Sequence, residues 1–552
     1  MQRAARRPGV GLALVLAILL AACTQGPARS GAPTGAPTGA PSGAAEQPRA
    51  GGQLVFIVSA EPPSFDGHKE TTFAMLHPTA PHYSLLLRFD PNDLTKVIPD
   101  VAATMPEASA DKLSYNVKLR DNVKFHDGTV LTSEDVVATY NKIIFPPSGV
   151  SSPRKGAYAA VESLSAPDKS TVVFKLKYPS ASFLTNLASP WNFIYSAAKL
   201  KEDIKYYEKS VMGTGPFEFA SYEKGSAWTG RKFKDYFLQG RPYLDGFRAV
   251  FIADANAQKN AIQGQQAMIE FRGFTPQQRD DLSRALPNNL AIQEAPWICV
   301  NYVSFNTTQK PFDDPRVRRA LTLGIDRWAG SEALQKITIV KDVGGLLRPK
   351  GPFAMADADL QKIAGFSKDI KASQDKARAL LKDAGQENLT FEFLNRNVTT
   401  PYEPVAVFLI NEWKKIGVTA THKVKETSAY LADLRNKNYQ VGLDFNCDFL
   451  DEPDLQLAKF YSASKLGAGL NLSHYDDPKL DSMIDAQGRE TDAAKRKQIV
   501  GDIERYAMDE MAYQWPVLWW YRIIPYNNKL RGWKIGSNHY TNQDLVSVWL
   551  AN

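Results

Sequence analysis

Residues able to make or break covalent bonds occur along this chain, but they form no recognised catalytic pattern. The sequence has no HExxH, GxSxG or GxxxxGKS/T motif, the spacings of zinc-protease, nucleophile-elbow and phosphate-binding sites. Its seven histidines are dispersed, and the separation of His77 and His82 is a weak metal-binding signal. We therefore expect no enzyme activity, no metal site and no cofactor. Because aspartate and glutamate are abundant, an exported hydrolase of cell-wall peptides or glycans is an alternative.

The three cysteines have different expected roles. None belongs to a CxxC pair, which disfavours a structural zinc site. Cys299 and Cys447 are far apart in the sequence. They can form one disulfide in an oxidising compartment or remain two buried thiols, and the sequence leaves both open. Cys23 belongs to an amino-terminal processing signal.

Length and composition are those of a large globular protein. The 552 residues allow several domains or two large lobes. Hydrophobic residues make up 44% and charged residues 23%, which is typical of soluble chains. The net charge of +7 becomes +4 if Arg3, Arg6 and Arg7 are removed with a signal peptide. Because lysine and arginine form no concentrated run, we expect no nucleic-acid partner.

The first fifty residues predict export. Basic residues precede an apolar run at 9–22, which is shorter than the ~20 residues of a membrane-spanning helix and fits a secretory signal. The run ends in Leu-Ala-Ala-Cys at 20–23, which resembles the lipobox of bacterial lipoproteins. We expect a signal peptide over 1–22, a lipid on Cys23 and a disordered Gly/Ala/Pro tether over 23–51. Ordinary signal cleavage beside an incidental cysteine is the alternative.

Strand and helix patterns alternate after the tether. Thr132 and Asp135 form a variant of the capping box that opens a helix. Ser373 is expected to cap a helix that ends before Gly385, and another helix ends before Gly417. Strand-forming runs occur at 54–58, 115–119, 171–176, 391–395 and 439–445. This mixture predicts an α/β fold.

Several stretches carry a family resemblance. Residues 119–137 read LRDNVKFHDGTVLTSEDVV, which resembles the signature of the family 5 extracellular solute-binding proteins, the peptide-, nickel- and oligopeptide-binding components of ABC importers. Further stretches resemble this family in the same order: GTGPF at 213–217, GRPYLD at 240–245, PFDDPRVRRA at 311–320 and IDR at 325–327. The resemblance covers roughly residues 52–550.

The resemblance implies a two-lobed, hinged fold like that of periplasmic binding proteins. The first lobe would span 52–300, the second lobe 301–510, and residues 511–552 would return to the first lobe. A monomer, exported to the periplasm or the outer face of the cytoplasmic membrane and lipid-anchored there, would capture a small, peptide-like solute between the lobes. It would deliver the solute to ABC permease and ATPase subunits. A membrane-tethered receptor that senses solute is a further alternative.

Arg396 is the first expected ligand-binding residue. It precedes Trp413 by 17 residues, and dipeptide-binding members of the family resemble it here, with an arginine that pairs the ligand carboxylate. The planar guanidinium makes two parallel hydrogen bonds to such a group. A surface or lobe-stabilising arginine is the alternative.

A second candidate is the loop from Phe445 to Phe449. Peptide-binding members carry a Trp three residues before an Asp that binds the peptide ammonium, four residues before a proline. Counted from Pro453, this chain has Phe449 at the Asp position and Asn446 at the Trp position. Either the loop is reshaped and an aspartate nearby binds the ammonium, or the ligand has no ammonium. The candidates are Phe445, Asn446, Cys447, Asp448, Phe449 and Asp451.

A third candidate is the turn at Glu61 and Pro62, which lines the cleft in the family but reads equally well as a plain turn. The family's Gly-Glu-x-Asp run is replaced here by Gly-Gln-Gln-Ala at 264–267, so no acidic contact is expected there. The ligand itself stays open among peptides, opine-like conjugates, oligosaccharides and metal complexes.

Overall fold

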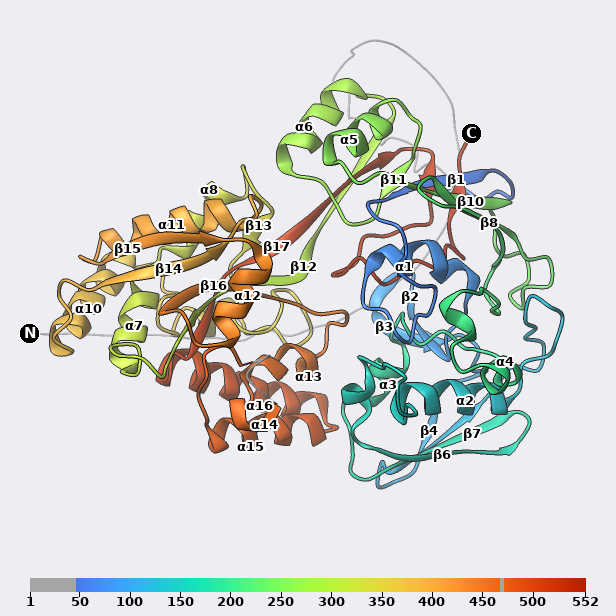
Figure 1. Ribbon diagram of the computed structural model, residues 1–552, viewed down its shortest axis with the longest axis horizontal. Helices are drawn as coiled ribbons and strands as arrows, with labels where there is room; N and C mark the ends of the chain where they lie inside the picture. The colour runs from blue at the N-terminus through green and yellow to red at the C-terminus, as the bar shows by residue number, and fades with distance from the viewer. Residues whose placement is uncertain (1–45, 467–470) are drawn as a thin grey trace, which may run out of the picture. The chain divides into compact units, whose positions relative to one another are not determined.

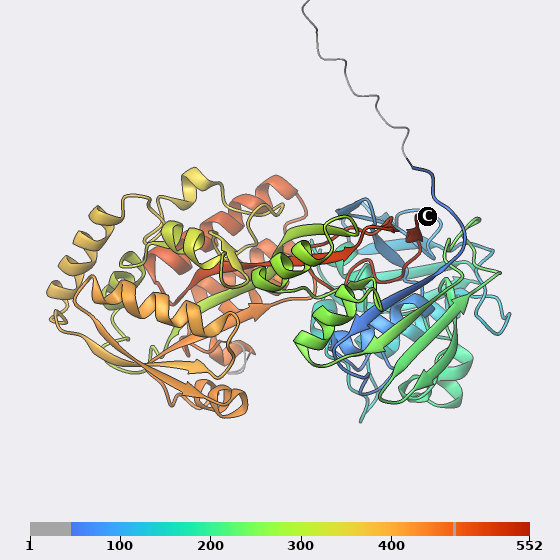
Figure 2. The same ribbon diagram turned by 90° about the horizontal axis from the view of Figure 1, so that it is seen from above.

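The computed structural model describes residues 46–466 and 471–552. The expected signal peptide (1–22), Cys23 and most of the tether (23–51) lie outside these residues. Pro48–Asn552 forms one compact unit, and its elements are drawn in Figures 1 and 2. Within the described ranges, no helix combines the length and apolarity needed to cross a bilayer.

Apolar strand formers near the start of the described chain build the first sheet. Leu54, Phe56, Ile57 and Val58 of β1 (Gln53–Val58) are fully buried, as expected for a parallel strand covered on both faces. This strand pairs in parallel with both neighbours. The order is β11-β1-β10-β9-β8, formed by β1 (Gln53–Val58), β8 (Phe217–Glu223), β9 (Ala227–Lys232), β10 (Gly246–Phe251) and β11 (Ile269–Glu270), with α5 (Ala255–Gln263) and α6 (Pro276–Ala285) following.

A smaller antiparallel sheet belongs to the same lobe. Its order is β4-β5-β7-β6, and β5 and β7 have the alternating burial of a strand with one exposed face. The elements of this part are α1 (Phe73–Thr79), β2 (Leu87–Asp90), β3 (Asp93–Pro99), β4 (Glu107–Ala108), β5 (Ser114–Lys118), α2 (Ser133–Ile144), β6 (Val161–Asp168), β7 (Thr171–Leu176), α3 (Phe183–Leu187) and α4 (Ala197–Glu202).

The third sheet has six strands in the order β13-β17-β12-β16-β14-β15. It is formed by β12 (Leu290–Phe305), β13 (Val340–Asp342), β14 (Thr390–Arg396), β15 (Thr419–Lys425), β16 (Val441–Cys447) and β17 (Gln514–Asn527). The helices of this lobe are α7 (Pro315–Leu323), α8 (Arg327–Leu334), α9 (Asp357–Leu360), α10 (Ile370–Asp383), α11 (Tyr402–Lys414), α12 (Thr427–Arg435), α13 (Pro453–Gln456), α14 (Ala463–Leu466), α15 (Pro478–Arg489) and α16 (Ala493–Glu504). The short strands β18 (Leu530–Arg531) and β19 (Trp549–Leu550) pair near the carboxyl end.

Two long antiparallel strands, β12 and β17, connect the lobes (Figure 1). Core residues from Trp297 to Trp520 form one hydrophobic cluster. Residues from Ile524 onward join clusters made by the earlier part of the chain. Separate cores on either side of two strands are what a two-lobed α/β protein requires. The register of β12 with β17 shifts between Pro296 and Tyr302, at the passage from one core to the other.

Local signals in the sequence account for several element ends. The capping box of Thr132 and Asp135 is present at the start of α2, and both Gly385 and Gly417 have the positive φ that favours glycine after a helix. The prediction that Ser373 caps a helix is wrong, because α10 begins three residues earlier. Asp369 accepts the capping hydrogen bond there.

Candidate functional site

Two neighbouring cavities are lined by residues of both lobes. The larger has a volume of about 770 Å³, which is within the range of small-molecule sites, and the smaller has a volume of about 280 Å³. Cys447 and Asp448 line both cavities, so the two spaces meet at the end of β16. We call them the larger and the smaller cavity.

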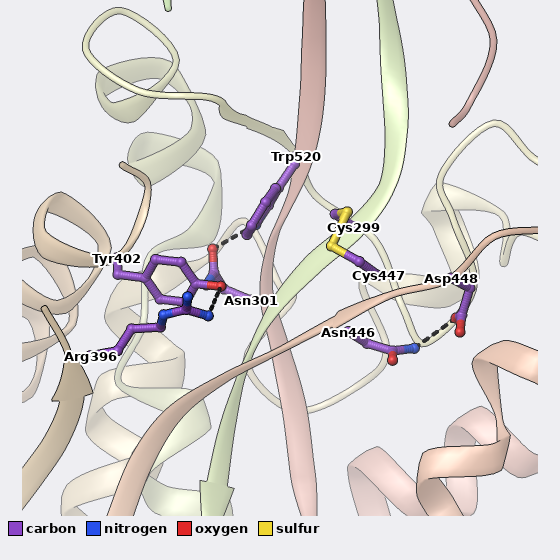
Figure 3. Close-up of a disulfide and its surroundings, with 8 residues drawn as sticks. All are labelled: Cys299, Asn301, Arg396, Tyr402, Asn446, Cys447, Asp448 and Trp520. Carbon is purple, nitrogen blue, oxygen red and sulfur yellow. Dashed lines mark hydrogen bonds between the residues drawn. A yellow bond between two sulfur atoms is a disulfide. The ribbon is translucent and has the colours of Figure 1, made fainter. Parts of the chain in front are cut away.

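A disulfide joins the strands at this meeting point. Cys299 of β12 and Cys447 of β16 are opposite each other in the strand register, with Cα atoms 4.2 Å apart and their sulfurs bonded (Figure 3). The structure therefore decides between the disulfide and the two free thiols that the sequence left open. The bond fixes the point at which the chain leaves β16 and enters the candidate loop.

Asp448 is the aspartate that lines both cavities, whereas Asp444, Asp454 and Asp485 line the larger one alone. Its carboxylate accepts a hydrogen bond of 2.8 Å from the Asn446 side-chain amide (Figure 3). Burial raises the pKa of Asp448 to about 7, while Asn446 and Lys459 act in the opposite direction. A carboxylate that is half-buried and incompletely compensated is suited to bind a cationic group of a ligand.

The other candidates in this loop have different surroundings. Asp451 forms an ion pair of 2.5 Å with Arg348 and accepts a hydrogen bond from Gln456, and it lines neither cavity. Phe449 packs against the hydrophobic core of the first lobe, and its carbonyl accepts a hydrogen bond from Asn538. Of the two aspartates, the structure therefore places only Asp448 at the cavities.

Arg396 lies at the end of β14, and its guanidinium lies beside the ring of Tyr402 (Figure 3). Its guanidinium carbon is 4.7 Å from the ring centre of Tyr402 and 5.2 Å from that of Phe445. One nitrogen donates to the Tyr402 hydroxyl at 3.3 Å, whereas Nε is buried without a hydrogen-bond partner, and no described carboxylate pairs with the group. Arg396 lines neither cavity. Arg396 is connected to the smaller cavity only indirectly. It contacts Tyr402, whose ring centre is 6.0 Å from that of Trp520, and Trp520 lines the smaller cavity.

The turn after β1 is placed elsewhere. Glu61 accepts a hydrogen bond from the Tyr222 hydroxyl, which lowers the pKa of Glu61, and Pro62 is buried. Neither residue lines the larger or the smaller cavity. The same loop reaches the smaller cavity further on, at Thr71, Thr72 and Phe73.

Several lining residues were not identified from the sequence. Trp297 and Trp520 come from the two connecting strands, and their rings are 5.7 Å apart. Arg272 and His539 reach the smaller cavity from the first lobe. Arg272 closely follows residues 264–267, where Gly-Gln-Gln-Ala replaces the family's Gly-Glu-x-Asp run. That replacement was the one sequence signal near this part of the cavity.

Three hydrogen bonds connect the lobes beside the cavities. The Ser182 hydroxyl donates to Asp454 at 2.5 Å, and the Ala181 amide donates to the Gly488 carbonyl at 3.0 Å. The Asn538 side chain donates to the Phe449 carbonyl at 3.2 Å. These contacts require the lobes to be close together, so they stabilise a closed cleft.

Comparison with known proteins identifies relatives over most of the chain. Residues 96–467 match the model of the bacterial extracellular solute-binding proteins, family 5. The oligopeptide-binding protein AppA of Bacillus subtilis is 27% identical over 543 residues, covering 92% of this chain and 93% of the relative. The glutathione-binding protein GsiB of Pectobacterium atrosepticum is 28% identical over 416 residues, covering 73% and 77%.

Solved structures share the fold at lower identity. The Helicobacter pylori periplasmic binding protein DppA, in complex with the peptide STSA, superposes with a TM-score of 0.73 at 23% identity and covers 91% of this chain and 99% of its own. The substrate-binding protein CtaP of Listeria monocytogenes has a TM-score of 0.77 at 24% identity, covering 91% and 100%. These similarities confirm the predicted two-lobed α/β fold.

Proposed function

The chain belongs to the bacterial extracellular solute-binding proteins of family 5, and from this premise we propose that its ligand is peptide-like. As a family member it is the substrate-binding component of an ABC importer. It captures a small solute in the cleft and delivers it to the membrane permease. The printed names of the relatives include oligopeptide-, di/tripeptide- and glutathione-binding proteins, and these compounds share an ammonium and a carboxylate.

The observation that carries the proposal is the position of Asp448 where the two cavities meet. Its carboxylate provides the negative charge that a peptide ammonium requires. Arg396, with a buried Nε that lacks a partner, provides a positive charge on the other side of Tyr402. Binding of the ligand carboxylate to Arg396 requires Tyr402 or Phe445 to move, because these rings cover the guanidinium. Charge-assisted hydrogen bonds at both ends fix the orientation of such a ligand.

The lobes support a closing motion. Ligand held by Asp448 and Arg396 of the second lobe contacts the first lobe across the cavities, and the three interlobe hydrogen bonds then form around it. The register shift between Pro296 and Tyr302 is the hinge in this proposal, with lobes of 52–300 and 301–510 and a return at 511–552. Hinge closure of this type is a known response to ligand. No bond of the solute is broken.

The experiment is identification of the natural ligand. Mass spectrometry of protein purified under native conditions should detect a peptide, and calorimetry with di- and tripeptides and glutathione should then measure its affinity. Binding to the native state must raise the melting temperature. If no peptide co-purifies or binds, the proposed ligand class is wrong. Release of a cleaved product from any bound peptide would show an enzyme instead.

Export and anchoring form a separate part of the proposal. Family members are extracellular, and the basic segment, apolar run and Cys23 of the sequence support a lipid tether to the outer face of the membrane; we propose that the tethered protein is a monomer. Cells labelled with radioactive palmitate should incorporate the label into the wild-type protein. A Cys23→Ala variant should be exported without label, and a labelled variant would refute lipidation at this residue.

A further inference from the structure

Arg272 is a cationic residue of the smaller cavity that no part of the binding site described so far uses. It follows β11 in the first lobe and lines the cavity together with Trp297 and Trp520 of the two connecting strands, β12 and β17. Its guanidinium carbon lies 4.2 Å from the ring centre of Phe73, another lining residue. Three aromatic side chains therefore surround the space next to this charge and limit its access to water.

The guanidinium of Arg272 has almost no polar partner in the protein. Its Nε is buried without a hydrogen bond, and no described carboxylate forms an ion pair with it. The carboxylate of Glu270, two residues earlier, does not pair with this guanidinium. It accepts hydrogen bonds from the backbone amides of Arg272 and Gly273 at 2.9 and 2.6 Å. A partly buried charge without a partner is costly unless a ligand neutralises it.

Arg522 is buried in the same region, and its hydrogen-bond partners can be compared with those of Arg272. Its guanidinium donates to the carbonyls of Gly536 and Asn538 at 2.9 and 2.7 Å, and also to Phe271. The Arg522 guanidinium, which joins segments of the first lobe, is thus saturated with backbone acceptors. Arg272 has none of them, so its guanidinium is free to bind something else.

Charges of both signs surround the smaller cavity. Arg272 and Asp448 line it, and Glu270 and Arg522 are buried nearby. Burial and these two guanidinium groups keep the pKa of His539 well below its usual value, so the neighbouring histidine remains neutral. An anion entering the smaller cavity meets the Arg272 guanidinium, which forms no ion pair with a described carboxylate, while Asp448 on the same cavity is left for the ligand's ammonium.

We propose that Arg272 binds an acidic group of the solute from the first lobe and thereby selects peptides that carry a carboxylate in addition to the terminal one. This inference rests on the proposed peptide-binding function and narrows its ligand class. Arg396 lies in the second lobe behind Tyr402, so the two arginines serve different groups of the ligand. An acidic group held by Arg272 also ties the ligand to the first lobe when the rest is bound to the second.

The test compares acidic peptides with their amides. Affinities of wild type and Arg272→Gln are measured by calorimetry for tripeptides of alanine with one glutamate, or one glutamine, at each of the three positions. Arg284→Gln, an arginine of the same lobe with an exposed side chain, is the matched control. Melting temperatures of all unliganded proteins show whether the variants are folded.

Wild type and the Arg284→Gln control should bind the preferred glutamate peptide about tenfold or more tightly than its glutamine counterpart, as expected for a charged hydrogen bond. In Arg272→Gln this ratio should fall to near one, while affinity for the glutamine peptide changes little. A ratio that survives in Arg272→Gln, or its absence in wild type, overturns the inference.

One further result would contradict the proposed peptide-binding function rather than the role of Arg272. If wild type binds none of the tripeptides, the peptide class is wrong, and thermal shift with glutarate and citrate then tests Arg272 alone. A stabilisation of wild type that Arg272→Gln lacks supports an anion site. No stabilisation by either acid overturns it.

Discussion

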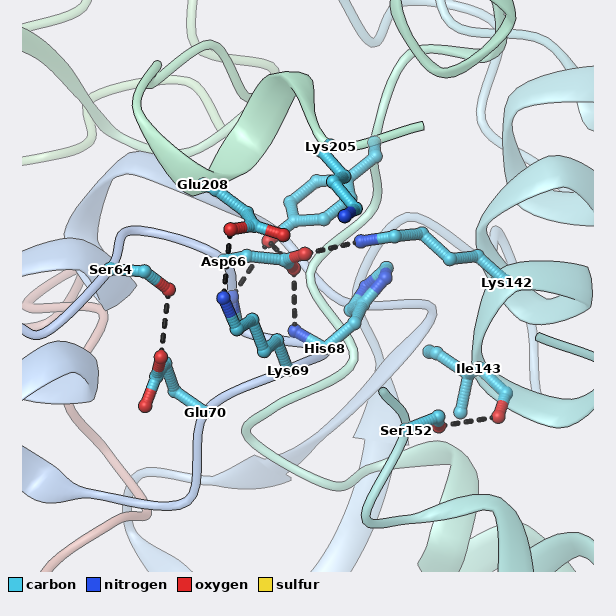
Figure 4. A network of polar contacts seen from close by, with 12 residues as sticks. Ser64, Asp66, His68, Lys69, Glu70, Lys142, Ile143, Ser152, Lys205 and Glu208 are labelled. Atoms are coloured by element: carbon cyan, nitrogen blue, oxygen red, sulfur yellow. Dashed lines mark hydrogen bonds and ion pairs between the residues drawn. The ribbon is translucent and has the colours of Figure 1, made fainter. Parts of the chain in front are cut away.

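Charged side chains are arranged in opposite ways in two regions of this molecule. In the first lobe, Asp66 and Lys142 form an ion pair of 2.5 Å with at most 3% of either side chain exposed (Figure 4). Asp66 also accepts hydrogen bonds from the His68 amide at 2.9 Å and the Tyr195 hydroxyl at 3.1 Å. The Asp66 carboxylate therefore has three partners, which compensate for its burial.

The charged groups in the cleft between the lobes have fewer polar partners than Asp66 has. Arg272 and Arg396 each have a buried Nε without a hydrogen-bond partner. Among the described residues, the Asp448 carboxylate accepts a side-chain hydrogen bond from Asn446 alone. Saturated charges fix a structure, whereas unsaturated ones bind a ligand when it arrives. The comparison thus separates residues that affect folding from residues that affect binding, and substitutions can test this separation.

The largest effect is expected at the saturated pair. Lys142→Met leaves Asp66 buried without its cation and should lower the free energy of unfolding by ~3–5 kcal/mol, measured by urea denaturation. Lys205→Met, at an exposed lysine, is the control and should change little. The double variant Asp66→Leu/Lys142→Met should recover much of the loss. If Lys142→Met lowers the free energy of unfolding by less than about 1 kcal/mol, the ion pair with Asp66 does not have the structural role assigned to it here.

The next effect is expected on binding alone. Arg396→Ala should weaken binding of an anionic peptide at least tenfold, ~1.4 kcal/mol or more, because the carboxylate loses its guanidinium partner. Its melting temperature without ligand should stay close to that of wild type, since Arg396 has no ion pair to lose. Arg435→Ala, an exposed arginine of the same lobe, serves as control. Unchanged affinity for an anionic ligand would remove Arg396 from the site.

A smaller effect follows from the titration of Asp448. With a pKa of about 7, this carboxyl is mostly neutral at pH 6, so affinity for a peptide ammonium should rise severalfold between about pH 6 and pH 7.5. Asp448→Asn should bind more weakly and lose this dependence in calorimetry. An equally steep pH profile in the variant would assign the titration to another group.

The same raised pKa has an opposite consequence for stability. The folded state holds the Asp448 proton more tightly than the unfolded state, so this contribution is present below about pH 4 and is lost as pH rises toward about 7. The stability of wild type relative to Asp448→Asn should therefore decrease over that range, as thermal denaturation at several pH values can measure. A relative stability that increases with pH would contradict the assigned direction.

The smallest effect is expected at the contacts between the lobes. Ser182→Ala removes the hydrogen bond to Asp454 but leaves that carboxylate with Gln487 and Arg496. Affinity should fall only about two- to fivefold, ~0.5–1 kcal/mol, mainly through faster dissociation. Ser170→Ala, in an exposed turn, is the control. A loss as large as that of Arg396→Ala would mean that Ser182 contacts the ligand itself.

Sequence patterns predicted local features of this fold better than they predicted the residues of the candidate binding site. The capping residue Thr132 and the terminal glycine Gly385 act through neighbours a few positions away, so they could be predicted. Ser373 was misassigned because Asp369 offers an equally good cap one turn earlier. The choice between Asp448 and Asp451 depended on Arg348, more than one hundred positions distant, and no local pattern contains that contact.

The cross-strand disulfide also concerns how the protein must be made. Cys299 and Cys447 can pair only where thiols are oxidised, and the cytosol keeps them reduced. Material produced inside the cytoplasm would carry two thiols beside Asp448, one of them on an exposed residue, which is open to alkylation or mixed disulfides at the mouth of the ligand cavities. Screening for ligands should therefore use protein that has been secreted or refolded under oxidising conditions, with its free-thiol content measured first.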